Sequence, residues 1–138
     1  MKWTTRIVNW LAVDTNIIRT IFYAGFVFIF GYAALYKVFE RTHMMEGMAA
    51  FGFNRTWTIA IGYAELLGVI GLLLGLIYPL VLRLSILWLI PFAIGAFTAH
   101  MAYNEYYHYY NALFCCVAPV VLFLTDKRLT IVYRKNGK

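Results

Sequence analysis

Four long apolar segments constrain the fold of this chain more than any other feature of its sequence. They cover residues 17–39, 56–78, 79–101 and 106–125, and each has about the 20 residues that a helix needs to cross roughly 30 Å of hydrocarbon. The chain has 138 residues, of which 63% are hydrophobic and 13% charged, so a folded monomer cannot hide its apolar surface from water. This composition excludes a disordered chain and a water-soluble monomer. It predicts an integral membrane protein with four spans.

The predicted fold is all-α, a four-transmembrane-helix antiparallel bundle formed by residues 17–125, with a short interfacial amphipathic helix at the N-terminus. Within the segment 1–16, one helical face would lie on the cytoplasmic leaflet, and it is formed by Trp3, Ile7, Trp10 and Leu11. Asp14, Thr15 or Asn16 would then cap the first span, because short polar side chains accept hydrogen bonds from the first free amides of a helix.

The second and third spans are nearly continuous in hydropathy, and Tyr78-Pro79 is the only interruption between them. Proline suits the first turn of a helix, so a very short hairpin is predicted at this point. The alternative is one helix of more than 40 residues, which would exceed the thickness of any bilayer. Pro91 and Pro119 lie inside spans, and each is expected to bend its helix.

Lysine and arginine residues are distributed unequally between the two sides of the predicted bundle. With both termini in the cytoplasm, the inner side carries nine of the twelve cations: Lys2, Arg6, Arg19, Arg83, Lys127, Arg128, Arg134, Lys135 and Lys138. The outer side carries only Lys37, Arg41 and Arg55. This positive-inside bias predicts that residues 126–138 form a basic cytoplasmic tail and that the inner side contacts anionic lipid. It argues against nucleic acid, because no basic stripe interleaves with exposed aromatic residues.

Small residues on the second span predict a helix-packing face. The stripe consists of Ala60, Ala64, Gly68, Gly71 and Gly75. Small residues let helix backbones approach closely in a membrane, and Gly71 with Gly75 forms a GxxxG pair. Glu65 flanks this face and is expected to point into the bundle. His100 shares a face of the third span with Ser85, Leu89, Ala93 and Ala96, and Lys37 follows Ala33 and Ala34 on the first span.

These ionisable side chains need a partner or a wet cavity, because a charge at bilayer depth costs about 2.5 kcal/mol or more. Glu65 lies nine residues after Thr56, roughly 13 Å along a helix and near the midplane, whereas Lys37 and His100 lie close to the outer boundary. The hypothesis is a polar pocket that opens outward, lined by Lys37, Glu65 and His100, with Tyr63, Asn104 or water between them. A direct bond between Lys37 and Glu65 would require a favourable helix tilt.

Three interpretations of this cluster stay open: a pair that only orients helices, a pocket for a ligand or redox partner, and a path for protons or ions. For Lys37 alone, snorkelling to the interface is the simpler interpretation. Arg19 and Arg83, near the inner ends of their spans, are predicted to be anchors for lipid phosphate.

Other polar groups give weaker signals. Cys115 and Cys116 are adjacent, so they face different sides of a helix and are expected to be small buried hydrophobes. No metal site is predicted; as an alternative, His43, Met44 and Met45 in the outer loop offer soft ligands for Cu(I). Haem ligation is not expected, because all three histidines, His108 included, lie at the outer edge. The tyrosine-rich run 103–111 is interpreted as an aromatic belt, with a ligand-stacking surface as the alternative.

The order of these features resembles the DoxX-like family of small four-helix membrane proteins. The similarity covers about residues 17–125 and depends on Arg19, on Gly31 with Lys37, on the run AELLGVIGLLLGL around Glu65, and on His100 at the end of the third span. The family often has glycine three residues before the lysine, where this chain has Ala34. A small residue is therefore retained at that position.

The resemblance implies a multi-pass protein of the plasma membrane (the inner membrane of a bacterium). It implies an accessory subunit of a quinone-linked redox system, with quinone as the implied cofactor and no enzymatic activity of the subunit alone. In that role Lys37 would hold an anion or a quinone oxygen, Glu65 would fix Lys37 or exchange a proton, and His100 would relay protons.

Two alternatives remain because one architecture serves several functions. The first is a non-catalytic assembly, chaperone or interaction protein for membrane partners, and the second is a small proton-coupled transporter. The expected partners are the lipid bilayer and a membrane-protein or redox partner. A homo-oligomer is a further alternative.

Overall fold

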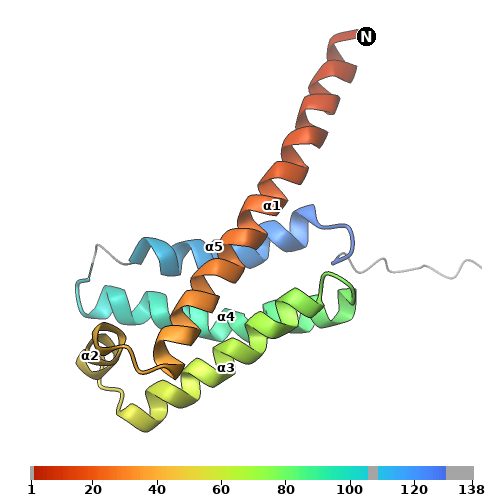
Figure 1. Ribbon diagram of the computed structural model, residues 1–138. Helices are drawn as coiled ribbons and strands as arrows, with labels where there is room; N and C mark the ends of the chain where they lie inside the picture. Colours follow the sequence, from red (N-terminus) through yellow and green to blue (C-terminus); the bar gives the residue numbers. More distant parts are fainter. Residues whose placement is uncertain (1, 106–108, 130–138) are drawn as a thin grey trace, which may run out of the picture.

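The computed structural model describes residues 2–105 and 109–129, and within these ranges every regular element is an α-helix (Figure 1). The helices are α1 (Lys2–Val38), α2 (Thr42–Ala50), α3 (Arg55–Leu74), α4 (Pro79–Ala102) and α5 (Tyr109–Thr125). Three stretches are long and apolar enough to cross a membrane: Thr15–Val38, Arg55–Leu74 and Pro79–Ala102. A fourth apolar helix, α5, has 17 residues. The predicted all-α membrane fold is confirmed.

The four long helices form a bundle in which each packs on two neighbours, in the cyclic order α1, α3, α4, α5. The centre is filled by buried apolar side chains from all four helices, among them Phe26, Phe30, Leu72, Leu82, Ile86, Leu89, Cys115 and Leu122. Two hydrogen bonds also join side chains of one helix to carbonyl groups of another. The Tyr23 hydroxyl donates to the Leu72 carbonyl at 2.7 Å, and Trp88 Nε1 donates to the Ala64 carbonyl at 2.8 Å.

The outer surface of the bundle is apolar, which is the arrangement that a lipid bilayer requires. Large hydrophobic side chains are exposed on every long helix, including Phe28, Leu67, Leu84 and Leu124. A soluble monomer rarely exposes a continuous apolar surface of this kind. Large apolar side chains, which a soluble protein would bury away from water, therefore face lipid here.

The N-terminal segment differs from the expected separate interfacial helix. Residues 2–16 continue into the first span without a break, so α1 is a single helix of 37 residues. The expected cap at Asp14, Thr15 or Asn16 does not form, because these residues lie within the helix. The segment contains neither proline nor glycine, so nothing in its backbone forces a break. Figure 1 shows the first turns of α1 extending well beyond the other helices.

The hairpin between the second and third spans is confirmed. Helix α3 ends at Leu74, a turn covers residues 75–78, and Pro79 is the first residue of α4. Proline fits there because the first helical residue needs no amide donor. The second span ends four residues earlier than the hydropathy pattern indicates.

The loop between the first and second spans contains a helix that the sequence analysis did not anticipate, α2, which lies against α1 and α3. Three helices end through the same backbone arrangement, with a left-handed residue after the last turn: Glu40 (φ 50°), Gly52 (φ 88°) and Asn104 (φ 57°). In each case the next amide donates to the carbonyl five residues earlier, as Arg41 does to Tyr36. Glycine and asparagine accept this conformation readily, whereas for glutamate it costs about 1–2 kcal/mol.

Two glycines of α3, and Gly75 directly after its last residue, bring this helix close to α4. A Cβ atom added at Gly68 would lie 2.5 Å from the Leu89 side chain, and one at Gly71 would collide with Ser85 Oγ. At Gly75 the obstacle includes backbone, since an added Cβ would lie 2.7 Å from Leu82 Cα. These three glycines are therefore positions where the α3–α4 contact leaves no room for a side chain.

We predict that Gly75→Ala destabilises the protein by about 1–3 kcal/mol, because backbone atoms of α4 must move to admit the methyl group. Gly95→Ala is the matched control on α4, since an added Cβ at Gly95 meets nothing within 4 Å. It should be neutral or stabilising by up to about 1 kcal/mol, because alanine favours helix. The measurement is the free energy of unfolding in detergent micelles, and equal effects of the two substitutions would contradict this packing.

Candidate functional site

A buried ion pair between α1 and α3 lies at the centre of the candidate site. Lys37 Nζ is 2.7 Å from Glu65 Oε2, and the exposed fractions of the two side chains are 7% and 6%. Lys37 is the penultimate residue of α1, whereas Glu65 lies halfway along α3. The pair therefore joins the C-terminal end of the first span to the middle of the second.

The sequence places these two side chains on facing stripes. On α1, the buried residues Phe26, Phe30, Ala34 and Lys37 recur at helical spacing. On α3, the corresponding residues are Thr58, Gly62, Glu65, Val69 and Leu72. Gly62 permits the close approach, because an added Cβ there would lie 2.7 Å from Lys37 Cβ and 3.2 Å from the Ala34 carbonyl oxygen.

This contact explains how Lys37, at the end of α1, reaches a carboxylate halfway along α3. Its Cβ lies beside Gly62, which follows the first residue of α3 by seven positions, about 10 Å along the helix. Lys37 is thus deeper than its position at the end of the first apolar segment indicates. The ammonium group bonds to Glu65 inside the bundle, so it does not snorkel to the interface.

The pair satisfies only part of its hydrogen-bonding capacity. A lysine ammonium has three donors and a carboxylate has two acceptor oxygens. Within the part of the chain that the structure describes, Lys37 and Glu65 have one hydrogen bond, the one between them. Two N–H donors and one carboxylate oxygen therefore remain for water or for the polar group of a ligand, in a region where unsatisfied polar groups are costly.

The other predicted members of the pocket have surroundings that differ from those of the buried pair. His100 Nδ1 is 3.0 Å from Glu105 Oε2, and its ring packs edge-on against Phe51 near the end of α4. Tyr63 is 58% exposed, on the outside of the bundle. This follows from its position two residues before Glu65, because residues at that spacing face different sides of a helix. Asn104 is exposed and occupies the left-handed position that ends α4. Tyr63 and Asn104 are therefore exposed, in contrast to the buried Lys37–Glu65 pair.

The residues that gave weaker signals in the sequence, the possible metal ligands and the two cysteines, do not form a second buried polar cluster in the described structure. His43 is exposed on α2, while Met44 and Met45 are half-buried. In the described residues, no group of three or more His, Cys, Asp or Glu side chains is placed to hold a metal ion. Cys115 is buried and Cys116 half-buried, and both are free thiols. His108 and residues 130–138 lie outside the described residues.

We predict that either Lys37→Met or Glu65→Met alone destabilises the protein by about 3–5 kcal/mol, because each leaves one buried group without its partner. The double variant Lys37→Met/Glu65→Met should lose much less stability than the two single changes together, since no uncompensated charge remains. A double-mutant cycle of unfolding free energies in micelles measures this coupling. Strictly additive effects would contradict a direct interaction.

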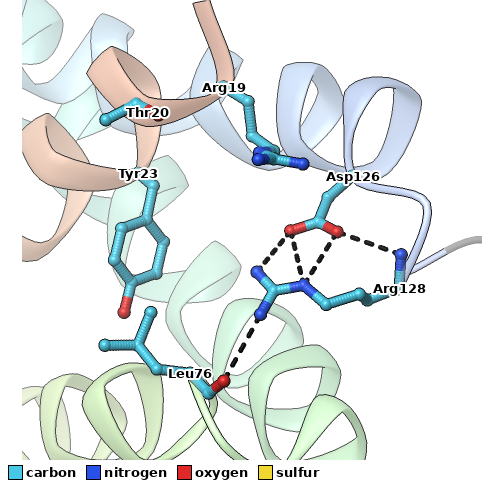
Figure 2. Close-up of a pocket in the computed structure, with 6 residues that line it drawn as sticks. All are labelled: Arg19, Thr20, Tyr23, Leu76, Asp126 and Arg128. Atoms are coloured by element: carbon cyan, nitrogen blue, oxygen red, sulfur yellow. Dashed lines mark hydrogen bonds and ion pairs between the residues drawn. The ribbon is translucent and has the colours of Figure 1, made fainter. Parts of the chain in front are cut away.

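A second polar cluster, which the sequence analysis missed, lies at the opposite end of the bundle. Asp126 is 3% exposed and follows the last residue of α5. Arg128 donates to it through Nε at 3.0 Å and Nη2 at 2.7 Å, and through its backbone amide at 3.0 Å (Figure 2). Arg128 Nη1 also approaches the Leu76 carbonyl oxygen at 3.4 Å, so it ties the end of α5 to the α3–α4 turn.

The hydrogen bonds from Arg128 hold the pKa of Asp126 below its ordinary value of 3.8; the nearby Arg19 charge adds to this lowering, and burial opposes it. A lowered pKa in the folded state stabilises the protein above the ordinary pKa. This stabilisation is lost as the pH falls through the folded value. We therefore predict that the thermal midpoint of the wild type exceeds that of Asp126→Asn at neutral pH. The difference should shrink only below about pH 4. A difference that already vanishes at pH 6 would contradict this assignment.

Comparison with known proteins gives one match. Residues 21–122 match the model of the DoxX-like family, and the matched region includes Lys37 and Glu65. Searches of curated proteins and of solved structures give no significant match.

Proposed function

Because this chain belongs to the DoxX-like family, we propose that it is an accessory subunit of a quinone-linked redox system, located in the plasma membrane with both termini in the cytoplasm. In this role the Lys37–Glu65 pair binds the polar head of a quinone, and catalysis of electron transfer belongs to a partner protein. The excess of cations on the side of the bundle that would hold both termini supports this orientation.

The observation that carries the proposal is the unused hydrogen-bonding capacity of a buried pair. A quinone carbonyl oxygen only accepts hydrogen bonds, and the two remaining N–H groups of Lys37 are the donors that it needs. The free oxygen of Glu65 would accept from a quinol hydroxyl. A bound quinone would supply two-electron chemistry, which none of the side chains of this site supplies by itself.

His100 has a separate role in this proposal. It pairs with Glu105 at the outer end of α4, where both side chains are partly exposed. An imidazole ring can both accept and donate a proton, so this pair would pass protons to and from the outer solution. Lys37 and Glu65 would bind and orient the head group, and His100 with Glu105 would act at the entrance.

The test uses the full-length chain purified in mild detergent and titrated with a short-chain quinone. We predict that Glu65→Gln and Lys37→Met each weaken binding roughly 10- to 100-fold, which corresponds to one hydrogen bond to a charged group. Glu40→Gln is the matched control, because Glu40 also forms an ion pair, with Arg55, but at the exposed outer surface. It should bind the quinone as the wild type does.

Two results would contradict the redox proposal: no binding to the folded wild type, or equal weakening by Glu40→Gln and Glu65→Gln. Thermal unfolding of each variant in the same detergent separates a loss of binding from a loss of structure. Membranes that contain the variants should also show a slower rate of quinone reduction.

A non-catalytic assembly protein is the second candidate, and one observation favours it. Lys37 and Glu65 neutralise each other at 2.7 Å, which is sufficient for a pair that only orients helices. In that case the double variant Lys37→Met/Glu65→Met, once shown to fold, would support partner assembly in cells as well as the wild type does. If the chain is instead a quinone-binding subunit, the same double substitution would abolish quinone binding and the function of the redox partner.

A further inference from the structure

A pocket of about 210 Å³ lies at the end of the bundle opposite α2, separate from the Lys37–Glu65 pair. It is lined by Arg19, Thr20, Tyr23, Leu76, Asp126 and Arg128. Figure 2 shows that these side chains come from three places in the chain: the first span, the α3–α4 turn and the end of α5. The pocket therefore exists only when the bundle is assembled.

The charges that line the pocket leave it positive. Asp126 is neutralised by Arg128, with three contacts between the guanidinium group and the carboxylate. Arg19 points toward the same carboxylate from the other side and adds a second cation (Figure 2). The Arg83 side chain reaches the same region, since its Nη2 donates to the Arg128 carbonyl at 2.7 Å. The predicted lipid anchors thus meet near one pocket, although Arg83 does not line it.

The polar side chains that line the pocket favour a ligand that accepts hydrogen bonds. The Thr20 hydroxyl donates to the Asn16 carbonyl, and the Tyr23 hydroxyl donates to the Leu72 carbonyl. Among the described residues, the Arg19 guanidinium has no hydrogen-bond partner, and Arg19 is only half-buried. Its planar set of N–H groups therefore remains available, and such a set matches two oxygens of a phosphate group.

Apolar side chains flank the pocket on two sides. On α1 next to Arg19, Ile18 and Ile21 are 42% and 57% exposed. In the turn next to Leu76, Ile77 is 72% exposed. A ligand with a phosphate group and acyl chains would contact both kinds of surface, whereas a free phosphate ion would contact only the guanidinium groups.

We propose that this pocket binds the phosphate group of an anionic phospholipid, with Arg19 as its principal ligand and Arg128 beside it. The Asp126–Arg128 interaction holds the second guanidinium group in place. The site anchors the end of α5 and the α3–α4 turn to the same lipid molecule that contacts α1. It does not depend on the quinone proposal, because none of its residues contacts Lys37 or Glu65 in the described structure.

The experiment measures lipid binding to the full-length chain in detergent by native mass spectrometry, with phosphatidylglycerol and phosphatidylcholine as probes. The wild type should prefer phosphatidylglycerol, because the choline cation adds positive charge beside two guanidinium groups. Arg19→Gln should weaken phosphatidylglycerol binding about fivefold, as expected for the loss of one cation near anionic lipid. Arg19→Lys should retain most of the binding.

Arg41→Gln is the matched control, because Arg41 is exposed at the other end of the bundle. It should leave phosphatidylglycerol binding unchanged, and so should Glu65→Gln if it folds, which separates this site from the quinone site. Equal binding by Arg19→Gln and the wild type, at unchanged thermal midpoints, would overturn the proposal. Inorganic phosphate is the third probe. If it binds in an Arg19-dependent manner while the two lipids bind equally, the site takes a soluble phosphate and the lipid assignment is wrong.

Discussion

A charge left alone in hydrocarbon costs at least about 2.5 kcal/mol, and Lys37 and Glu65 avoid that cost only by meeting each other. Their contact requires α1 and α3 to approach closely, which Ala34 and Gly62 permit. Once these two helices are fixed, the glycines on the neighbouring face of α3 bring α4 into contact, and α5 closes the ring against α1 and α4. The order of the bundle thus follows from one polar contact and from the small residues around it.

The two polar clusters of the bundle balance their charges differently. In the Lys37–Glu65 pair, one cation meets one carboxylate inside the protein, and little of either side chain is exposed. In the cluster after α5, one buried carboxylate faces Arg19 and Arg128, so positive charge remains at the surface. The first arrangement suits a neutral polar ligand within the membrane. The second suits an anion at its boundary.

Much of the fold was predictable from the sequence, because hydropathy over about 20 residues and a single proline between two spans are strong local signals. The inward-facing position of Glu65 was also predictable from the small-residue stripe beside it. The N-terminal break was predicted wrongly, since polar residues such as Asp14 suggest a cap but do not force one. Helix α2 was missed because its nine residues are too few to form a membrane span, which is the signal that predicted the long helices.

The candidate site was predicted less well, because depth and side-chain direction depend on how helices cross. Tyr63 could have been excluded from the predicted pocket, because it lies two residues from Glu65 and faces another side of the helix. Asn104 could have been excluded because it follows the end of a span. The Asp126–Arg128 cluster carries no motif, and only the fold brings Arg19 beside it.

The continuity of α1 has a mechanical consequence. A helix of 37 residues is about 55 Å long, nearly twice the thickness of the hydrocarbon core. Its N-terminal turns extend past the other helices, and its far end carries Lys37 (Figure 1). Because α1 is continuous between these ends, a protein that binds the N-terminal turns could turn the whole helix. Rotation of α1 about its axis would then move the buried Lys37 side chain at its other end.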